Sequence, residues 1–143
     1  MSLFSALSVS ASGMAAQRAR SELLVENLAN AETTRTPGGG PYRRKDVVFA
    51  SEQTPAAFAS VFEAALAPAG VRVAEVVVDQ REPERRYLPG HPDAGPDGYV
   101  LFPRVNPAED MVDLMSSTRG YQANVAAMTA VKDMIQRTLE LFR

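Results

Sequence analysis

The stretch from Asn106 to Arg143, NPAEDMVDLMSSTRGYQANVAAMTAVKDMIQRTLELFR, decides the fold. It opens with a helix start, because Asn106 can cap free amides, Pro107 suits the first helical position and Glu109 lies where a capping-box acid belongs. A spacing of three or four residues then marks one stripe: Met111, Leu114, Thr118, Tyr121, Val125, Met128, Lys132, Ile135, Leu139 and Phe142. Most of these residues are apolar, and no proline follows Pro107. The pattern predicts a helix of about 50 Å to the C-terminus, with a narrow seam suited to coiled-coil packing.

The N-terminal stretch predicts a second, less perfect amphipathic helix. Residues 3–31 contain no proline and one glycine. The same spacing picks out Leu3, Leu7, Met14, Leu24, Leu28 and Ala31, with polar gaps at Ser10, Gln17 and Ser21. The β-branched pair at 33–34 and the run PGGGP at 37–41 indicate where this helix ends, because neither helix nor strand tolerates such a run.

The middle of the chain has the composition of loops and short strands. Most of the prolines and seven of the nine glycines lie between residues 36 and 105. Runs of β-branched or aromatic residues at 47–49, 71–78 and 99–102 predict strands of a small β-rich insert. Residues 81–98 are expected to form an exposed loop, and residues 56–67 have a helical composition that leaves their structure open.

The fold class predicted from these segments is α+β. Long N- and C-terminal helices (1–35 and 106–143) are expected to pack as a coiled-coil pair, with the Pro/Gly-rich loop and β-rich insert (36–105) between them. The residues expected in the packing seam are Leu3, Leu7, Met14, Leu24, Leu28, Met111, Leu114, Tyr121, Val125, Met128, Ile135, Leu139 and Phe142. The pattern leaves two interpretations open: a seam satisfied within one antiparallel hairpin, or a seam that also pairs across chains in a stacked assembly.

Composition and charge exclude several classes of function. Fifteen Lys and Arg against seventeen Asp and Glu give a net charge of −2, so nothing favours a nucleic-acid or anionic-membrane partner. The absence of cysteine excludes disulfides. No window approaches the roughly 20 apolar residues of a membrane span. The N-terminus lacks the basic start and apolar stretch of a signal peptide, so we expect no cleaved leader.

No catalytic or metal-binding constellation is evident. His91 is the only histidine and lies in a turn-like PGHP sequence without a second imidazole or thiol. The basic run at 43–45 is expected either to grip an acidic neighbour or to be a solvated face, and the pair Glu109-Asp110 suits the positive end of the helix dipole. Methionines near Tyr121 favour packing over a promiscuous binding face. We therefore expect no catalysis, cofactor or metal.

Two blocks near the N-terminus carry a family resemblance. Residues 11–18, ASGMAAQR, and 27–34, NLANAETT, resemble the signature of the flagellar rod and hook family. The continuation at 35–37 and 39–49, RTP and GGPYRRKDVVF, is similar to the proximal rod protein, the FlgC type of that family. The signature residues are Gly13, Met14, Asn27, Leu28, Ala29, Asn30, Gly39, Gly40, Pro41, Tyr42, Arg43 and Arg44.

The C-terminal part carries the same resemblance. The matching positions are Gly98, Tyr99, Val100, Pro103, Val105 to Pro107, Met111 to Met115, Arg119, Tyr121, Asn124 and Lys132. The resemblance covers roughly residues 1–50 and 98–143, and residues 51–97 match no pattern of the family. Arg104 stands where the family pattern has Asn, and Asp110 replaces a common Glu.

The resemblance implies a structural subunit of the flagellar rod. Such proteins are exported by the flagellar type III apparatus without leader cleavage, stack around a central export channel in the periplasm and transmit motor torque to the hook. The partners implied are further copies of the chain, other rod proteins, a rod-base adaptor and the membrane ring. Asn27 and Asn30 would either set the register between neighbours or serve as polar helix-end residues. A monomeric helical adaptor or export chaperone is the second hypothesis, and an enzyme that uses the 81–98 loop is the third.

Overall fold

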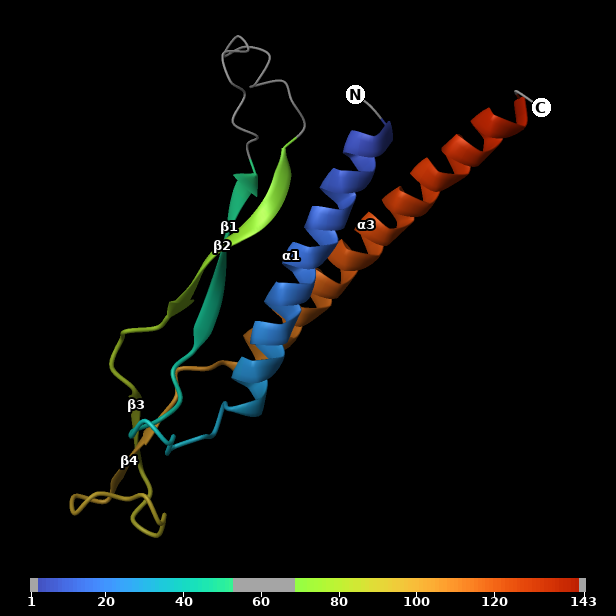
Figure 1. The fold of residues 1–143 in the computed structure, drawn as a ribbon. Coiled ribbons are helices and arrows are strands. Elements are labelled where there is room, and N and C mark those ends of the chain that lie inside the picture. Colours follow the sequence, from blue (N-terminus) through green and yellow to red (C-terminus); the bar gives the residue numbers. More distant parts are fainter. Residues whose placement is uncertain (1–2, 53–68, 142–143) are drawn as a thin grey trace, which may run out of the picture.

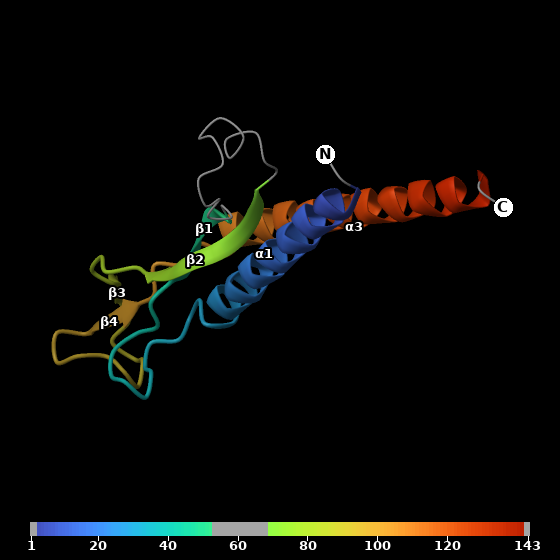
Figure 2. The same cartoon turned by 45° about the horizontal axis from the view of Figure 1, so that its top comes forward.

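The computed structural model describes residues 3–52 and 69–141 of the chain. Two long helices, α1 (Leu3–Ala29) and α3 (Pro107–Leu141), lie side by side. The two chain ends lie at the same end of this pair, so the helices are antiparallel (Figures 1 and 2). Short strands fill the middle of the chain, which confirms the predicted α+β class with long terminal helices.

Helix α1 ends at Ala29, before the β-branched pair that was expected to stop it. The backbone N–H of Asn30 donates to the carbonyls of Glu26 and Asn27 at 3.1 and 3.2 Å, which tightens the last turn. The side chain of Asn30 also donates to the carbonyl of Glu26 at 2.9 Å. The side chain of Asn30 thus adds a second hydrogen bond to a carbonyl of the last helical turn.

Helix α3 starts at the predicted cap. The Oδ1 atom of Asn106 accepts the backbone N–H of Ala108 at 3.2 Å, and the Asn106 carbonyl accepts that of Asp110 at 3.0 Å. The helix runs as one element to Leu141, and the predicted seam residue Phe142 lies outside the described residues.

The described strands form two separate antiparallel pairs. β1 (Lys45–Glu52) pairs with β2 (Gly70–Val78) beside α1, with Lys45 opposite Val78 and an irregularity between Val48 and Phe49. β3 (Glu84–Tyr87) pairs with β4 (Tyr99–Phe102) beyond the end of the helix pair that lies opposite the termini (Figure 1). The strands expected at 47–49, 71–78 and 99–102 all fall within these elements. The question left open for residues 56–67 falls outside the described residues.

The expectation of a loop throughout 81–98 is wrong for β3. Its sequence, ERRY, has the polarity of a loop, but the pairing with β4 gives its charged side chains aromatic partners. The guanidinium groups of Arg85 and Arg86 lie 5.1 and 4.8 Å from the ring centroids of Tyr99 and Phe102. Contacts of this kind between neighbouring strands stabilise the pair and cannot be seen in the local sequence of β3 alone.

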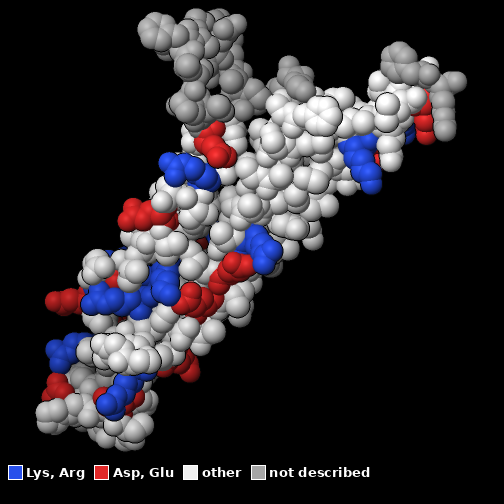
Figure 3. Space-filling model, in the orientation of Figure 1, with Lys and Arg blue, Asp and Glu red and all other residues white. Residues whose placement is uncertain are grey.

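The described chain buries little apolar surface. Its buried apolar residues are Ala16, Leu24, Tyr42, Val100, Phe102 and Val131. Many large apolar side chains on α3 and on the strands are exposed instead. On the face drawn in Figure 3, charged side chains gather toward the strands, and an extended uncharged area covers the helix pair above them up to the charged side chains near the end of α3. Neither described helix combines the length and hydropathy needed to cross a bilayer.

Candidate functional site: the helix pair and its junction with the strands

The contact between α1 and α3 contains small and polar side chains as well as the buried Val131. The hydroxyls of Ser21 and Ser117 lie 2.8 Å apart across the helices, and Ser117 is almost completely buried. Ser10 on α1 is buried as well, as are the apolar Ala16 and Leu24 further along the helix. Small residues at such a contact allow the two helix backbones to approach closely.

Each helix contributes a glycine that faces an amide of the other helix. A Cβ atom on Gly13 would lie 2.9 Å from Oδ1 of Asn124, and a Cβ atom on Gly120 would lie 3.2 Å from Cδ of Gln17. The Asn124 amide is held in place, because its Nδ2 donates to the Gly120 carbonyl at 2.9 Å. The Oε1 atom of Gln17 is buried without a hydrogen-bond partner. The reciprocal glycines therefore fix the register of the pair by shape.

The predicted seam residues divide into two groups. Leu24 is buried, and those half-buried in the described chain are Leu7, Met14, Leu28, Leu114, Met128 and Ile135. Leu3, Met111, Tyr121, Val125 and Leu139 are exposed, with fractions from 40% to 65%. The apolar stripe of α3 therefore flanks the contact with α1 instead of forming its centre.

Sequence reasoning missed the polar contact face because small polar residues do not register as a hydrophobic seam. The signal was nevertheless present: the polar gaps in the N-terminal stripe, Ser10, Gln17 and Ser21, are the positions that meet α3 or are buried. The single glycine of the C-terminal helix, Gly120, marks the close approach from the other side.

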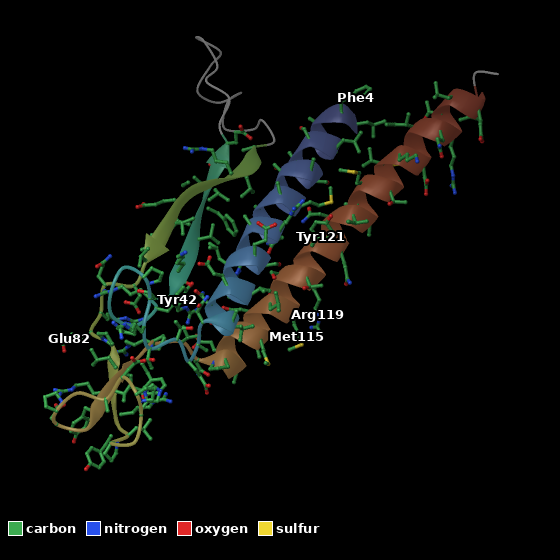
Figure 4. The ribbon with its side chains drawn as sticks, turned by 60° about the horizontal axis from the view of Figure 1, so that its bottom comes forward. Phe4, Tyr42, Glu82, Met115, Arg119 and Tyr121 are labelled. Atoms are coloured by element: carbon green, nitrogen blue, oxygen red, sulfur yellow. The ribbon has the colours of Figure 1, made fainter. Side chains whose placement is uncertain are left out.

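The surface that α3 leaves exposed carries many large apolar side chains among its polar ones. Exposed large side chains follow most of its length: Met111, Val112, Met115, Tyr121, Val125, Met134, Leu139 and Leu141. Figure 4 shows Met115 and Arg119 projecting from the side of α3 that faces away from α1. Exposed apolar side chains in this number are typical of a contact with another protein.

Asn27 ties the end of α1 to the start of β1. It is fully buried, and its Oδ1 accepts the Lys45 backbone N–H at 3.0 Å and the Tyr42 hydroxyl at 2.9 Å. Its Nδ2 donates to the Lys45 carbonyl at 2.8 Å. Burial raises the pKa of Tyr42 to about 12, so the hydroxyl remains a donor. The amide of Asn27 thus pairs with the backbone of β1 as a neighbouring strand would.

This geometry bears on the two roles considered for the asparagines. Every hydrogen bond given for Asn27 is internal, and the side chain is closed to a neighbouring molecule. Asn30 bonds to Glu26 and accepts the Thr33 hydroxyl at 3.2 Å. Both residues act at the helix end, and the alternative of setting register between subunits is not supported for Asn27.

The glycine turn of the signature brings Tyr42 to Asn27. Gly39 and Gly40 have φ angles of 84° and 75°, a conformation that favours glycine. The Thr36 backbone N–H donates to the Gly40 carbonyl at 2.8 Å, which closes the turn, and the Tyr42 N–H donates to the Thr33 carbonyl at 3.0 Å. The role of the glycines is thus to reverse the chain between α1 and β1.

The basic run at 43–45 holds acidic groups of its own chain. Lys45 pairs with Glu26 on α1, and Nη2 of Arg44 lies 3.0 Å from Oδ1 of Asp110 on α3. Asp110 is fully buried, so the helix dipole alone does not explain it as the sequence suggested. Burial raises its pKa above the ordinary value, against the opposing effect of Arg44. The pair has the distance of an ion pair but not the alignment of a hydrogen bond, and neither oxygen of Asp110 has a donor.

The remaining polar residues offer no chemistry in the described chain. His91 lies in the loop between β3 and β4, where its Nδ1 accepts the Asp93 backbone N–H at 3.1 Å. Within residues 3–52 and 69–141, no group of three or more His, Cys, Asp or Glu side chains is arranged to hold a metal ion. The notable features of the described chain are therefore structural: two closely packed helices, exposed apolar side chains on α3 and a hydrogen-bonded junction between α1 and β1.

Comparison with known proteins gives one consistent result. Residues 97–141 match the family model described as "Flagellar basal body rod FlgEFG protein C-terminal". The chain is 41% identical to the flagellar basal-body rod protein FlgC of Bacillus subtilis, with 99% of each chain covered. It is 36% identical to the FlgC of Borreliella burgdorferi, over 100% of this chain and 99% of the relative. It is 38% identical to the FlgC of Salmonella typhimurium, over 99% of this chain and 98% of the relative.

These similarities extend across the part of the sequence, residues 51–97, for which no resemblance had been identified, because the aligned regions span nearly the whole chain. The resemblance drawn from the N- and C-terminal motifs is confirmed. The chain belongs to the FlgC family of flagellar basal-body rod proteins.

Proposed function

We propose that this chain is a structural subunit of the proximal rod that self-assembles around the export channel and transmits motor torque to the hook. The observation that carries the proposal is the division of surfaces on α3. The face toward α1 includes the small or polar Ser117 and Gly120 beside the buried Val131, whereas many large apolar side chains of α3 stay exposed. A chain that served only its own core would have turned the apolar face inward.

In the proposed rod, the exposed stripe of α3 packs against helices of neighbouring subunits. Met111, Tyr121, Val125 and Leu139 would lie in this contact, while Leu24 stays within the chain's own helix pair. Fully burying one such side chain contributes about 1.5–3 kcal/mol. Many contacts of this size, repeated from subunit to subunit, would share the load that a rotating rod carries.

The location and partners that we propose are supported by the family. The relatives are named as rod proteins of the flagellar basal body, which supports assembly with other rod proteins, with a rod-base adaptor and with the membrane ring. We further propose a periplasmic position and export by the flagellar type III apparatus without leader cleavage. Catalysis plays no part in this mechanism.

A charge placed in the stripe tests the proposal. Val125→Asp is expected to abolish incorporation into isolated basal bodies and swimming, because a carboxylate would be buried between subunits. Ala123→Asp is the matched control: it places the same charge on an exposed position two residues away, on the opposite side of α3. Circular dichroism shows whether both variants keep their helices.

Two results would reject the proposal. One is normal swimming of the Val125→Asp strain. The other is a wild-type chain that stays monomeric at high concentration and is absent from purified basal bodies, which would favour the adaptor hypothesis. Equal loss of assembly in both variants would show that added charge, rather than the apolar stripe, is what the rod does not tolerate.

A further inference from the structure

The strands are held to α3 in a different way from their attachment to α1. Helix α1 packs directly against β1 and β2, whereas no Cα atom of a described strand lies within 8 Å of one in α3. Apart from the short segment 103–106, the link between the described strands and α3 must therefore be made by long side chains. Arg44, just before β1, reaches Asp110 in the first turn of α3.

The Arg44–Asp110 pair is a poor source of stability. Asp110 is fully buried, its two oxygens lack hydrogen-bond donors, and Arg44 is shared with Asp46 at 3.3 Å. An ion pair that is removed from water without complete hydrogen bonding regains little of its desolvation cost. Buried charges of this kind are retained in some proteins because they select one arrangement over its alternatives.

We propose that the buried Arg44–Asp110 pair is a positioning joint that fixes the angle between the helix pair and the strands, and that it holds only while Asp110 is charged. Arg44 lies immediately before Lys45, whose backbone and side chain are bound to α1 through Asn27 and Glu26. Two consecutive residues therefore fasten the strands to both helices. Without the attraction between Arg44 and Asp110, the strands keep only their attachment to α1 and the connecting segment 103–106, and they can swing relative to α3.

The charged groups around Asp110 influence the pH at which it takes up a proton. Arg44 and Asp46 face it from the start of β1, and Glu109 and Asp113 from α3 itself. On α1, Arg20 is paired with Asp113 and Glu26 with Lys45, and Tyr42 lies close by on the segment before β1. Burial above all, and then the three neighbouring carboxylates, disfavour the negative charge of Asp110, so its pKa lies above that of a free aspartate although Arg44 opposes the shift. Acidification would release the joint without unfolding the chain.

The angle can be measured on the full chain, because it contains no cysteine. Ala74→Cys on β2 and Ser116→Cys on α3 are both at exposed positions, and spin labels there report the distance between the strands and α3. Asp110→Asn is expected to broaden the distance distribution at neutral pH. Glu109→Gln, which removes an exposed carboxylate from the same helical turn, is the matched control and is expected to leave it narrow.

The pH dependence of the distance distribution distinguishes a positioning role of the Arg44–Asp110 pair from a role in packing alone. In the parent chain the distribution should broaden as the pH falls through the pKa of Asp110, followed by carboxyl carbon NMR, while Asp110→Asn should show no such response. A narrow distribution in Asp110→Asn, or an unchanged pH response in that variant, would overturn the proposal. Should Asp110→Asn fail to fold, Arg44→Lys against Arg44→Met decides: only the charge-keeping lysine is expected to stay narrow. This experiment needs no assembled rod, so its outcome is independent of the proposed function.

Discussion

The hydrogen bonds of Asn27 allow a stability change to be worked out from the structure. Asn27→Ala removes three bonds, to the Lys45 N–H, the Lys45 carbonyl and the Tyr42 hydroxyl. At ~0.5–1.5 kcal/mol for each bond, the free energy of unfolding should fall by roughly 1.5–4.5 kcal/mol. The upper part of this range is expected, because the site is closed to water and the abandoned groups lose their partner. Tyr42→Phe removes only one of the three bonds and should cost ~0.5–1.5 kcal/mol.

Urea unfolding followed by circular dichroism measures both variants. Asn30→Ala is the matched control, since it removes an asparagine three residues away that is half-buried and bonded only within the end of the helix. The expected order of loss is Asn27→Ala first, with the other two variants well behind. A loss of unfolding free energy in Asn27→Ala no larger than that in Tyr42→Phe would refute the reasoning, because the two hydrogen bonds between the Asn27 amide and the backbone of β1 would then contribute no stability.

Three further predictions concern the helix pair and the charged groups. Gly13→Leu should destabilise the chain by ~1–3 kcal/mol in urea unfolding, because its side chain must enter the space of an amide on α3, whereas Gly38→Ala should change little, since no atom lies within 4 Å. The pKa of Asp79 is lowered to about 2 by its hydrogen bonds from Arg81, so its contribution to stability is present above the unfolded pKa and is lost as the pH falls toward about 2. Asp79→Asn should therefore be less stable than the parent at neutral pH and equal to it near pH ~2, measured by unfolding at each pH. The charge of Asp110 has the opposite effect on stability, because its pKa is raised and the charged form destabilises the fold above that pKa. Asp110→Asn should therefore be at least as stable as the parent at neutral pH. This difference in stability should shrink as the pH falls. A stability loss for Asp110→Asn that grows toward neutral pH would contradict this sign.

The sequence predicted the features that depend on period and on local capping. Asn106 caps α3 as expected, and the antiparallel arrangement is one of the two interpretations that the apolar spacing allowed. What the spacing did not predict was which face of α3 meets α1. Apolar periodicity identifies a surface that avoids water, and in this chain that surface is distinct from the face on which Ser117 and Gly120 fit against α1.

The junction between α1 and β1 was harder to predict from the sequence. The motif around Asn27 was recognisable as a family signature, but its task depends on Lys45, which is 18 residues away and presents only backbone groups to it. A hydrogen bond to a backbone group does not depend on the partner's side chain, so the sequence pattern does not reveal it. Asp110 was misread for a related reason, since an acid in a first helical turn is normally solvated, and only the fold brings Arg44 against it.

Helix α3 extends beyond the described start of α1, and this extension relates the contact between the two helices to the proposed assembly. The contacts of Gly13 with Asn124 and of Gln17 with Gly120 set one antiparallel register, in which Leu3 falls opposite residue 134. Helix α3 continues to Leu141, so its last two turns extend beyond the described start of α1 (Figure 1). Leu139 and Leu141 in this extension are 65% and 85% exposed. Sliding the helices to cover them would drive Asn124 and Gln17 away from the glycines that accommodate them. The fitted contact thus holds α3 in a position that leaves Leu139 and Leu141 exposed, and in the proposed rod a neighbouring subunit would cover them without disturbing the pair.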